Sequence, residues 1–193
     1  MGIHITGVGS YIPSHKERNQ DFLAHTFLDD SGNPFGAENG DIIEKFKAIT
    51  GIEERRYAKP HQTASDLAFL AAEKAIEDAS LDPETLDYII VAHNFGDIQH
   101  GRIQTDILPS LATRVKHNLQ IKNPNCVAYD LIFGCPGWVE GVIQAQAFIK
   151  SGMAKRCMVI GADTLSRIAD QNDRDAMIFA DGAGATIIEE TEE

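Results

Sequence analysis

The sequence predicts an α/β protein with a mainly parallel sheet, and three observations support this prediction. Strand-like and helix-like segments alternate along the chain, as they do in folds built from β-α-β units. Two helix-like segments, at residues 63–79 and 137–151, are each followed by an expected strand. The run at 87–92 is almost entirely apolar, which is typical of a strand buried on both faces.

The first expected element is a strand at residues 3–8, where the residues alternate in polarity, and Gly9 begins the break after it. Residues 14–60 form an irregular insertion with a long loop rich in turn-forming residues. A short helix is predicted at 41–50, and Gly51 is expected to end it.

The clearest helix is expected at residues 63–79. Its apolar positions recur with the 3.6-residue period of an α-helix, and most of them are alanine. We therefore expect this helix to pack closely against a neighbouring element. Thr63 or Ser65 is the expected N-terminal cap, because short hydroxyl side chains accept bonds from the first free amides of a helix.

The rest of the chain alternates more regularly, although its pattern does not determine the order of the strands. Polar connections are expected at 93–106 and 166–176. Further strands are predicted at 87–92, 125–130, 156–163 and 182–190, and further helices at 107–119 and 137–151.

Composition and charge exclude several classes of function. The chain has 193 residues, of which 43% are hydrophobic and 24% are charged, as in ordinary globular proteins. Its formal net charge of −12 provides no basic surface for nucleic acid. No apolar run reaches the ~18 residues that a membrane-spanning helix needs. The sequence therefore predicts neither a nucleic-acid partner nor a membrane partner.

The three cysteines, Cys126, Cys135 and Cys157, argue against a disulfide framework because their number is odd and their spacing is wide. No Cys-x-x-Cys pair is present, so a structural zinc site is not expected. A reducing cytoplasm fits this cysteine usage best.

Two glycine-rich motifs resemble nucleotide-binding loops but lack their context. "GVGSYI" at 7–12 lacks the third glycine of a dinucleotide fingerprint, and Pro13 blocks the helix that should follow. "DGAGA" at 181–185 leads into a strand rather than a helix. We interpret the second motif as backbone packed closely beside a buried site.

The loop "HNFGDIQH" at 93–100 contains three residues that could bind a metal, namely His93, Asp97 and His100. Their spacing matches no common zinc pattern. We therefore expect no metal, and interpret the loop as the lining of a pocket or an interface.

Cys135 lies in "YDLIFGCPGWVEG", where an expected strand ends and an expected helix begins. A thiol just before a helix lies near free backbone amides and the positive end of the helix dipole. That environment favours the reactive thiolate, and Pro136 suits the first helical position. A small, inert buried cysteine is the alternative, and the local pattern alone leaves both interpretations open.

Four segments in order resemble the N-terminal half of 3-oxoacyl-ACP synthase III, the initiating ketosynthase of the thiolase superfamily. The segments are "GVGSYIP" at 7–13, "TGIEERRYA" at 50–58, "AYDLIFGCPGW" at 128–138 and "DRDAMIFADGAGA" at 173–185. The resemblance implies a thiolase-like N-terminal domain spanning 1–193, with a mostly parallel, mixed five-stranded sheet and helices on both faces.

The resemblance also implies a chemistry. Cys135 would accept an acyl group from acyl-CoA or another acyl thioester. A malonyl group on acyl carrier protein would then lose carbon dioxide and attack the acyl-enzyme. Both thioesters are substrates, so no bound cofactor is implied.

Four further positions follow from the resemblance as substrate-binding residues. Arg174 aligns with an arginine at the CoA nucleotide, and Lys45 stands where a tryptophan often stacks on adenine. Phe133 and Trp138 replace smaller or different residues beside the cysteine and would reshape the acyl pocket.

Members of this family draw a catalytic His and Asn from a second, homologous half. The resemblance therefore predicts that this chain alone is catalytically incomplete, as a truncated product, a proteolytic product or one part of a split enzyme. A homodimer and contact with the missing half are the expected assemblies. The alternatives are a non-catalytic module for dimerisation or carrier binding, and a sibling acyltransferase that uses a different general base.

Overall fold

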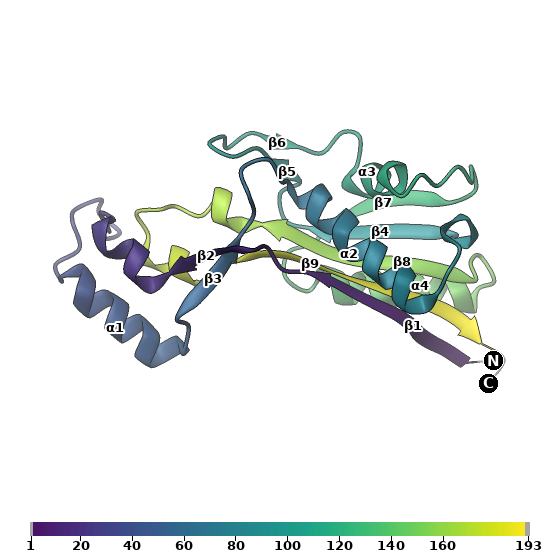
Figure 1. Cartoon of the computed structure of the whole chain (residues 1–193), viewed down its shortest axis with the longest axis horizontal. Coiled ribbons are helices and arrows are strands. Elements are labelled where there is room, and N and C mark those ends of the chain that lie inside the picture. The colour runs from purple at the N-terminus through teal and green to yellow at the C-terminus, as the bar shows by residue number, and fades with distance from the viewer. Residues whose placement is uncertain (1, 192–193) are drawn as a thin grey trace.

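The computed structural model describes residues 2–191, and its centre is a mixed five-stranded sheet (Figure 1). The strands lie in the order β1-β9-β8-β4-β7. β4 pairs in parallel with β8 and β7, whereas β9 is antiparallel to β8 and β1. Only β9 is therefore reversed, which confirms the predicted mostly parallel sheet. The strand bounds are β1 Gly2–Tyr11, β4 Tyr88–His93, β7 Val127–Ile132, β8 Arg156–Thr164 and β9 Asp181–Thr191.

Helices cover both faces of this sheet, as predicted. α2 (Ala64–Ala79) packs on β1, β9 and β8, and α3 (Leu111–Asn118) extends the same layer over β4 and β7. α4 (Gly137–Lys150) packs on the opposite face, mainly on β8 and β4. The sheet therefore separates two apolar cores, one under α2 and α3 and one under α4.

The predicted alanine stripe forms the buried face of α2. Ala68, Ala71 and Ala75 are fully buried. Thr63 occupies the N-cap, and its backbone N–H donates to the Asp66 carboxylate at 2.8 Å. Of the two caps that the sequence offered, Thr63 is therefore the one used, and Ser65 has a different partner, described below.

The glycines of the "GVG" motif allow β1 to approach α2. A Cβ atom at Gly7 would lie 2.5 Å from the carbonyl oxygen of Ala75, and one at Gly9 would also overlap the helix backbone. Alanine on the helix and glycine on the strand thus bring the two backbones into direct contact. The close packing of β1 on α2 therefore explains the glycines of this motif, and no nucleotide-binding role is needed to explain them.

The insertion contains a two-stranded antiparallel sheet that the sequence pattern did not predict. β2 (His15–Arg18) pairs with β3 (Glu54–Tyr57) in an antiparallel arrangement. α1 (Asn39–Thr50) ends at Gly51, whose φ of 70° gives the expected left-handed cap. A separate small core lies beneath α1 and consists of Phe22, Phe27, Ile42, Ile43 and Met177.

The connection after β4 is partly ordered as two short strands, β5 (Asp97–Ile98) and β6 (Thr105–Asp106). The helix predicted from residue 107 begins four residues later, because the Ser110 hydroxyl accepts the N–H of Thr113 and acts as the N-cap. Among residues 2–191, no helix combines the length and apolarity that crossing a membrane requires.

The tight contact between β1 and α2 predicts a cost for one added methyl group. Gly9→Ala is expected to lower the free energy of unfolding by about 1–3 kcal/mol, because overpacking forces the strand and helix apart. Denaturant unfolding followed by circular dichroism measures this loss. Gly184→Ala is the matched control, since a Cβ there meets nothing within 4 Å. Equal stability of both variants would contradict the packing argument.

Candidate functional site

Cys135 lies in a turn that connects the end of β7 to the start of α4. Gly134 has a φ of +50°, a left-handed conformation that glycine adopts without strain. The Gly137 N–H donates to the Gly134 carbonyl at 3.1 Å and closes the turn. Pro136 occupies the N-cap rather than the predicted first helical position. Cys135 is exposed in this turn, whereas Cys126 and Cys157 are buried.

A cavity of about 320 Å³ lies beside Cys135, at the carboxyl ends of β4 and β8. Its floor includes the glycines of the "DGAGA" motif, Gly182 and Gly184. The motif therefore lies beside a cavity, although this cavity is open rather than buried as predicted. Close packing is not the reason for both glycines, because a Cβ at Gly184 would meet nothing within 4 Å. Gly184 instead leaves open space beside the cavity, whereas a Cβ at Gly182 would lie 3.4 Å from the Tyr11 carbonyl oxygen.

Trp138 and Phe133 lie on opposite sides of Cys135 in the sequence and have different surroundings. Trp138 lines the Cys135 cavity and packs on Gly161 of β8. It also lines a neighbouring cavity of about 460 Å³ that reaches Val8 of β1. Phe133 is exposed and does not line the Cys135 cavity. Of the two predicted aromatic residues, only Trp138 therefore shapes the space next to the thiol.

Lys45 and Arg174 come together at a second cavity of about 480 Å³, between α1 and the residues after Asp173. The Arg174 guanidinium carbon lies 4.5 Å from the centre of the Phe35 ring, in a cation–π contact. Asp41 and Asp175 line the same cavity, so two acidic side chains accompany the two basic ones. This cavity shares no lining residue with the Cys135 cavity.

Asp163 is a feature of the site that the sequence did not reveal. It lines the Cys135 cavity from β8, and burial raises the pKa of its carboxyl group. Its two oxygens accept the backbone N–H of Asn94 at 2.9 Å and the Asn94 side-chain Nδ2 at 2.6 Å. One sequence signal could have identified Asp163, because it is an acidic residue at the carboxyl end of a predicted parallel strand.

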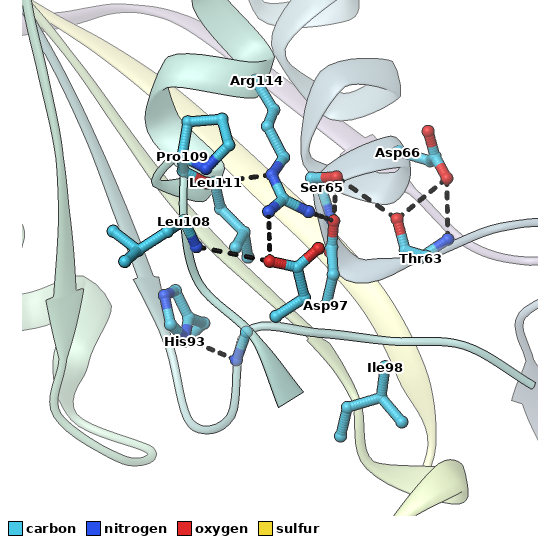
Figure 2. A network of polar contacts seen from close by, with 12 residues as sticks. Thr63, Ser65, Asp66, His93, Asp97, Ile98, Leu108, Pro109, Leu111 and Arg114 are labelled. Atoms are coloured by element: carbon cyan, nitrogen blue, oxygen red, sulfur yellow. Dashed lines mark hydrogen bonds and ion pairs between the residues drawn. The ribbon is translucent and has the colours of Figure 1, made fainter. Parts of the chain in front are cut away.

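The loop after β4 is held by a polar network centred on Asp97 (Figure 2). The Asp97 carboxylate accepts the Ser65 backbone N–H at 2.7 Å and the Ser65 hydroxyl at 2.6 Å. The Arg114 guanidinium also donates to it at 2.6 Å and reaches Asp106 at 2.8 Å. Because Asp97 is buried and fully bonded, it ties the loop to the start of α2 and to α3.

His93 belongs to a different set of contacts, so the three candidate metal-binding residues of this loop do not converge. Its Nε2 lies 3.1 Å from the Asp130 carboxylate, and its Nδ1 accepts the Gly96 N–H at 2.9 Å. Across residues 2–191, no group of three or more His, Cys, Asp or Glu residues is arranged to hold a metal ion. His100 lines a separate cavity with Tyr57 and Arg167, in accordance with the interpretation of the loop as a pocket lining.

Comparison with known sequences identifies relatives along nearly the whole chain. A profile of the family described as 3-Oxoacyl-[acyl-carrier-protein (ACP)] synthase III matches residues 129–193. The chain is 40% identical over 185 residues to the Beta-ketoacyl-[acyl-carrier-protein] synthase III of Neisseria meningitidis serogroup C. That alignment covers 95% of this chain and 51% of the relative. The chain therefore spans about half the length of the curated relatives it matches.

Comparison with solved structures points the same way. The 3-oxoacyl-[acyl-carrier-protein] synthase III of Aquifex aeolicus matches with a TM-score of 0.78 and 34% identity, over 100% of this chain and 55% of that one. The synthase from Burkholderia xenovorans matches with a TM-score of 0.81 and 24% identity, over 100% and 50% of the two chains, which bears on the fold alone.

The different burial of the three cysteines predicts selective alkylation. Burial raises the pKa of the Cys157 thiol to about 12 and also raises the pKa of Cys126, so little thiolate forms at either position. Iodoacetamide at neutral pH is expected to modify Cys135 alone in the folded protein and all three cysteines after unfolding. Peptide mapping by mass spectrometry measures this, and prompt labelling of Cys157 in the folded chain would contradict it.

Proposed function

We propose that this chain, which belongs to the 3-oxoacyl-[acyl-carrier-protein] synthase III family and matches the N-terminal half of its members, carries the nucleophile of a condensing enzyme. The enzyme would join an acyl thioester to a malonyl group in fatty-acid or related biosynthesis. The observation that supports this most directly is Cys135, an exposed thiol at a strand-to-helix turn beside an open cavity. An inert cysteine would not need that exposure.

The first proposed step is acyl transfer to Cys135. The Cys135 thiolate attacks the carbonyl carbon of the acyl thioester and forms a carbon–sulfur bond to it. The bond between that carbon and the donor's own sulfur then breaks. The departing thiolate takes up a proton. During attack, negative charge develops on the carbonyl oxygen, and the backbone N–H of Cys135 is the proposed first donor to it.

The second proposed step forms the new carbon–carbon bond. A malonyl thioester loses carbon dioxide, and the electron pair of the broken bond becomes an enolate. The enolate carbon attacks the acyl carbonyl, and the Cys135 thiolate leaves. No histidine lines the Cys135 cavity among residues 2–191. We therefore expect the chain alone to accept an acyl group but not to complete the condensation.

The substrate contacts are proposed from the two cavities. Trp138 would limit the acyl group next to Cys135, and Phe133 would border the entrance from its exposed position. Lys45 and Arg174 would meet the phosphate-bearing end of the donor, since both line the cavity under α1. The donor is acyl-CoA or a carrier-bound acyl thioester, and acyl carrier protein is the proposed partner for the malonyl group.

A homodimer and contact with a second half are the proposed assemblies. Several large apolar side chains are exposed, and the proposed contacts would cover them. Ile103 and Leu108, in the loop after β4, are 86% and 82% exposed, and Ile143 on α4 is 54% exposed. The first two would lie at the subunit contact and Ile143 at the contact with the second half.

Acylation of Cys135 is the direct test of the proposed function. The chain is incubated with acetyl-CoA and with octanoyl-CoA, and the adduct is mapped by mass spectrometry. One acyl group is expected on the peptide that contains Cys135, and Cys135→Ala should abolish it because no other exposed thiol is present among the described residues. Labelling elsewhere but never at Cys135 would favour a non-catalytic module for dimerisation or carrier binding.

The position of Trp138 between two cavities predicts a change in acyl selectivity. Trp138→Ala is expected to join the cavities and to raise the ratio of decanoyl to acetyl transfer about tenfold, because apolar pockets discriminate by size. Initial rates of Cys135 acylation with the two CoA esters measure this ratio. Val139→Ala is the matched control, since Val139 is exposed on the same helix. An unchanged ratio in Trp138→Ala would contradict the assignment.

A further inference from the structure

The carboxyl ends of three neighbouring parallel strands place Asp163 and Asn94 beside the Cys135 turn. β4 lies between β8 and β7 and pairs in parallel with both. Asp163 is near the end of β8, Asn94 directly follows β4, and the Cys135 turn follows β7. Asn94 therefore stands between the carboxylate and the nucleophile turn.

The contacts of Asn94 fix the orientation of its side chain. The Asp163 carboxylate can only accept hydrogen bonds, so the Asn94 Nδ2 faces it at 2.6 Å. The backbone N–H of Asn94 donates to the second carboxylate oxygen at 2.9 Å. The Asn94 Oδ1 is then directed toward Gly134 and lies 3.6 Å from the place that a Cβ atom there would occupy.

Gly134 is the residue whose conformation sets the direction of Cys135. Its φ of +50° turns the chain immediately before the thiol, and the Asn94 amide oxygen is the nearest atom to its open side. We infer that Asp163 is a positioning residue that acts through Asn94 to hold the turn carrying Cys135. This inference rests on the proposed role of Cys135 as the nucleophile.

The charge of Asp163 gives the inference a second, electrostatic consequence. Besides Cys135, Asp163 is the only ionisable side chain that lines the cavity within residues 2–191, and no lysine or arginine lines it. Burial is the main cause of the raised pKa of the Asp163 carboxyl group, and Asp181 adds to it, whereas the bonds from Asn94 and the nearby His93 lower that pKa and favour the carboxylate. A carboxylate held in this cavity repels a thiolate that forms in the same space.

A second carboxylate clamp on the same two strands supplies a matched control. Asp87, just before β4, accepts the backbone N–H groups of Lys155 and Arg156 at 2.7 and 3.0 Å. This clamp also links the regions of β4 and β8, but at the opposite end of the sheet from Cys135. Loss of the Asp87 carboxylate should therefore lower the stability of the fold without changing the reactivity of the Cys135 thiol.

The test measures the rate of Cys135 alkylation by iodoacetamide from about pH 6 to about pH 10. The variants are Asp163→Asn, Asn94→Ala, their double variant and Asp87→Asn. Protection of Cys126 and Cys157 in the same mass spectra shows that each variant is folded. Iodoacetamide needs no acyl-transfer activity, so this experiment remains decisive even where the proposed condensation function fails.

Asp163→Asn is expected to move the half-maximal pH of alkylation down by about half a unit or more, because a repelling charge is removed. Asn94→Ala should move it in the same direction, and the double variant should match the larger single shift, as residues of one unit do. Asp87→Asn should leave the profile unchanged. An unchanged profile in Asp163→Asn, or additive shifts, would overturn the inference.

The positioning role has its own readout in the comparison of two reagents. At a pH where alkylation has reached its plateau, acetyl transfer from acetyl-CoA in Asp163→Asn should fall about tenfold, because acyl transfer demands correct geometry. Alkylation by the small reagent should fall much less. If the acetyl-transfer rate and the alkylation rate fell by the same factor, this result would contradict a positioning role for Asp163 and would indicate a purely electrostatic effect.

Discussion

The parallel pairing of β4 with both β8 and β7 is the constraint on which the candidate site depends. It brings three chain segments to one edge of the sheet, although Asp163 is 69 residues from Asn94 in the sequence. β4 is itself almost completely buried, so the central strand at this edge is held by packing on both of its faces. A thiol that must meet its substrate at a defined distance benefits from such support.

The elements that the sequence predicted well are those whose signal is local. α2 and α4 were recognised within a residue of their ends because their apolar periodicity lies within the helix itself. The Cys135 turn was recognised because glycine and proline mark it. β2 and β3 were missed, since "HKER" and "ERRY" are charged four-residue strands that exist only through pairing across the insertion.

The candidate site was predictable only in part for the same reason. Cys135 and Trp138 are neighbours in sequence, and the structure places both at one cavity. The prediction of Lys45 and Arg174 came from family resemblance alone, and they lie together at a different cavity. The contacts of Asp163 with Asn94 have no short-range pattern at all, because they follow from strand order. The two acidic residues beside Lys45 and Arg174 were likewise beyond the reach of residue-by-residue analysis.

The glycines of β9 that line the Cys135 cavity have a consequence for how the size of this cavity can change. With glycine at 182 and 184, β9 contributes little side-chain volume to the cavity, since Ala183 adds only a methyl group. A methyl group at 184 would fill space without displacing any neighbour, since nothing lies within 4 Å of a Cβ atom there. An atom added at this one position would therefore reduce the space beside Cys135 while the Cys135 turn and α4 stay where they are.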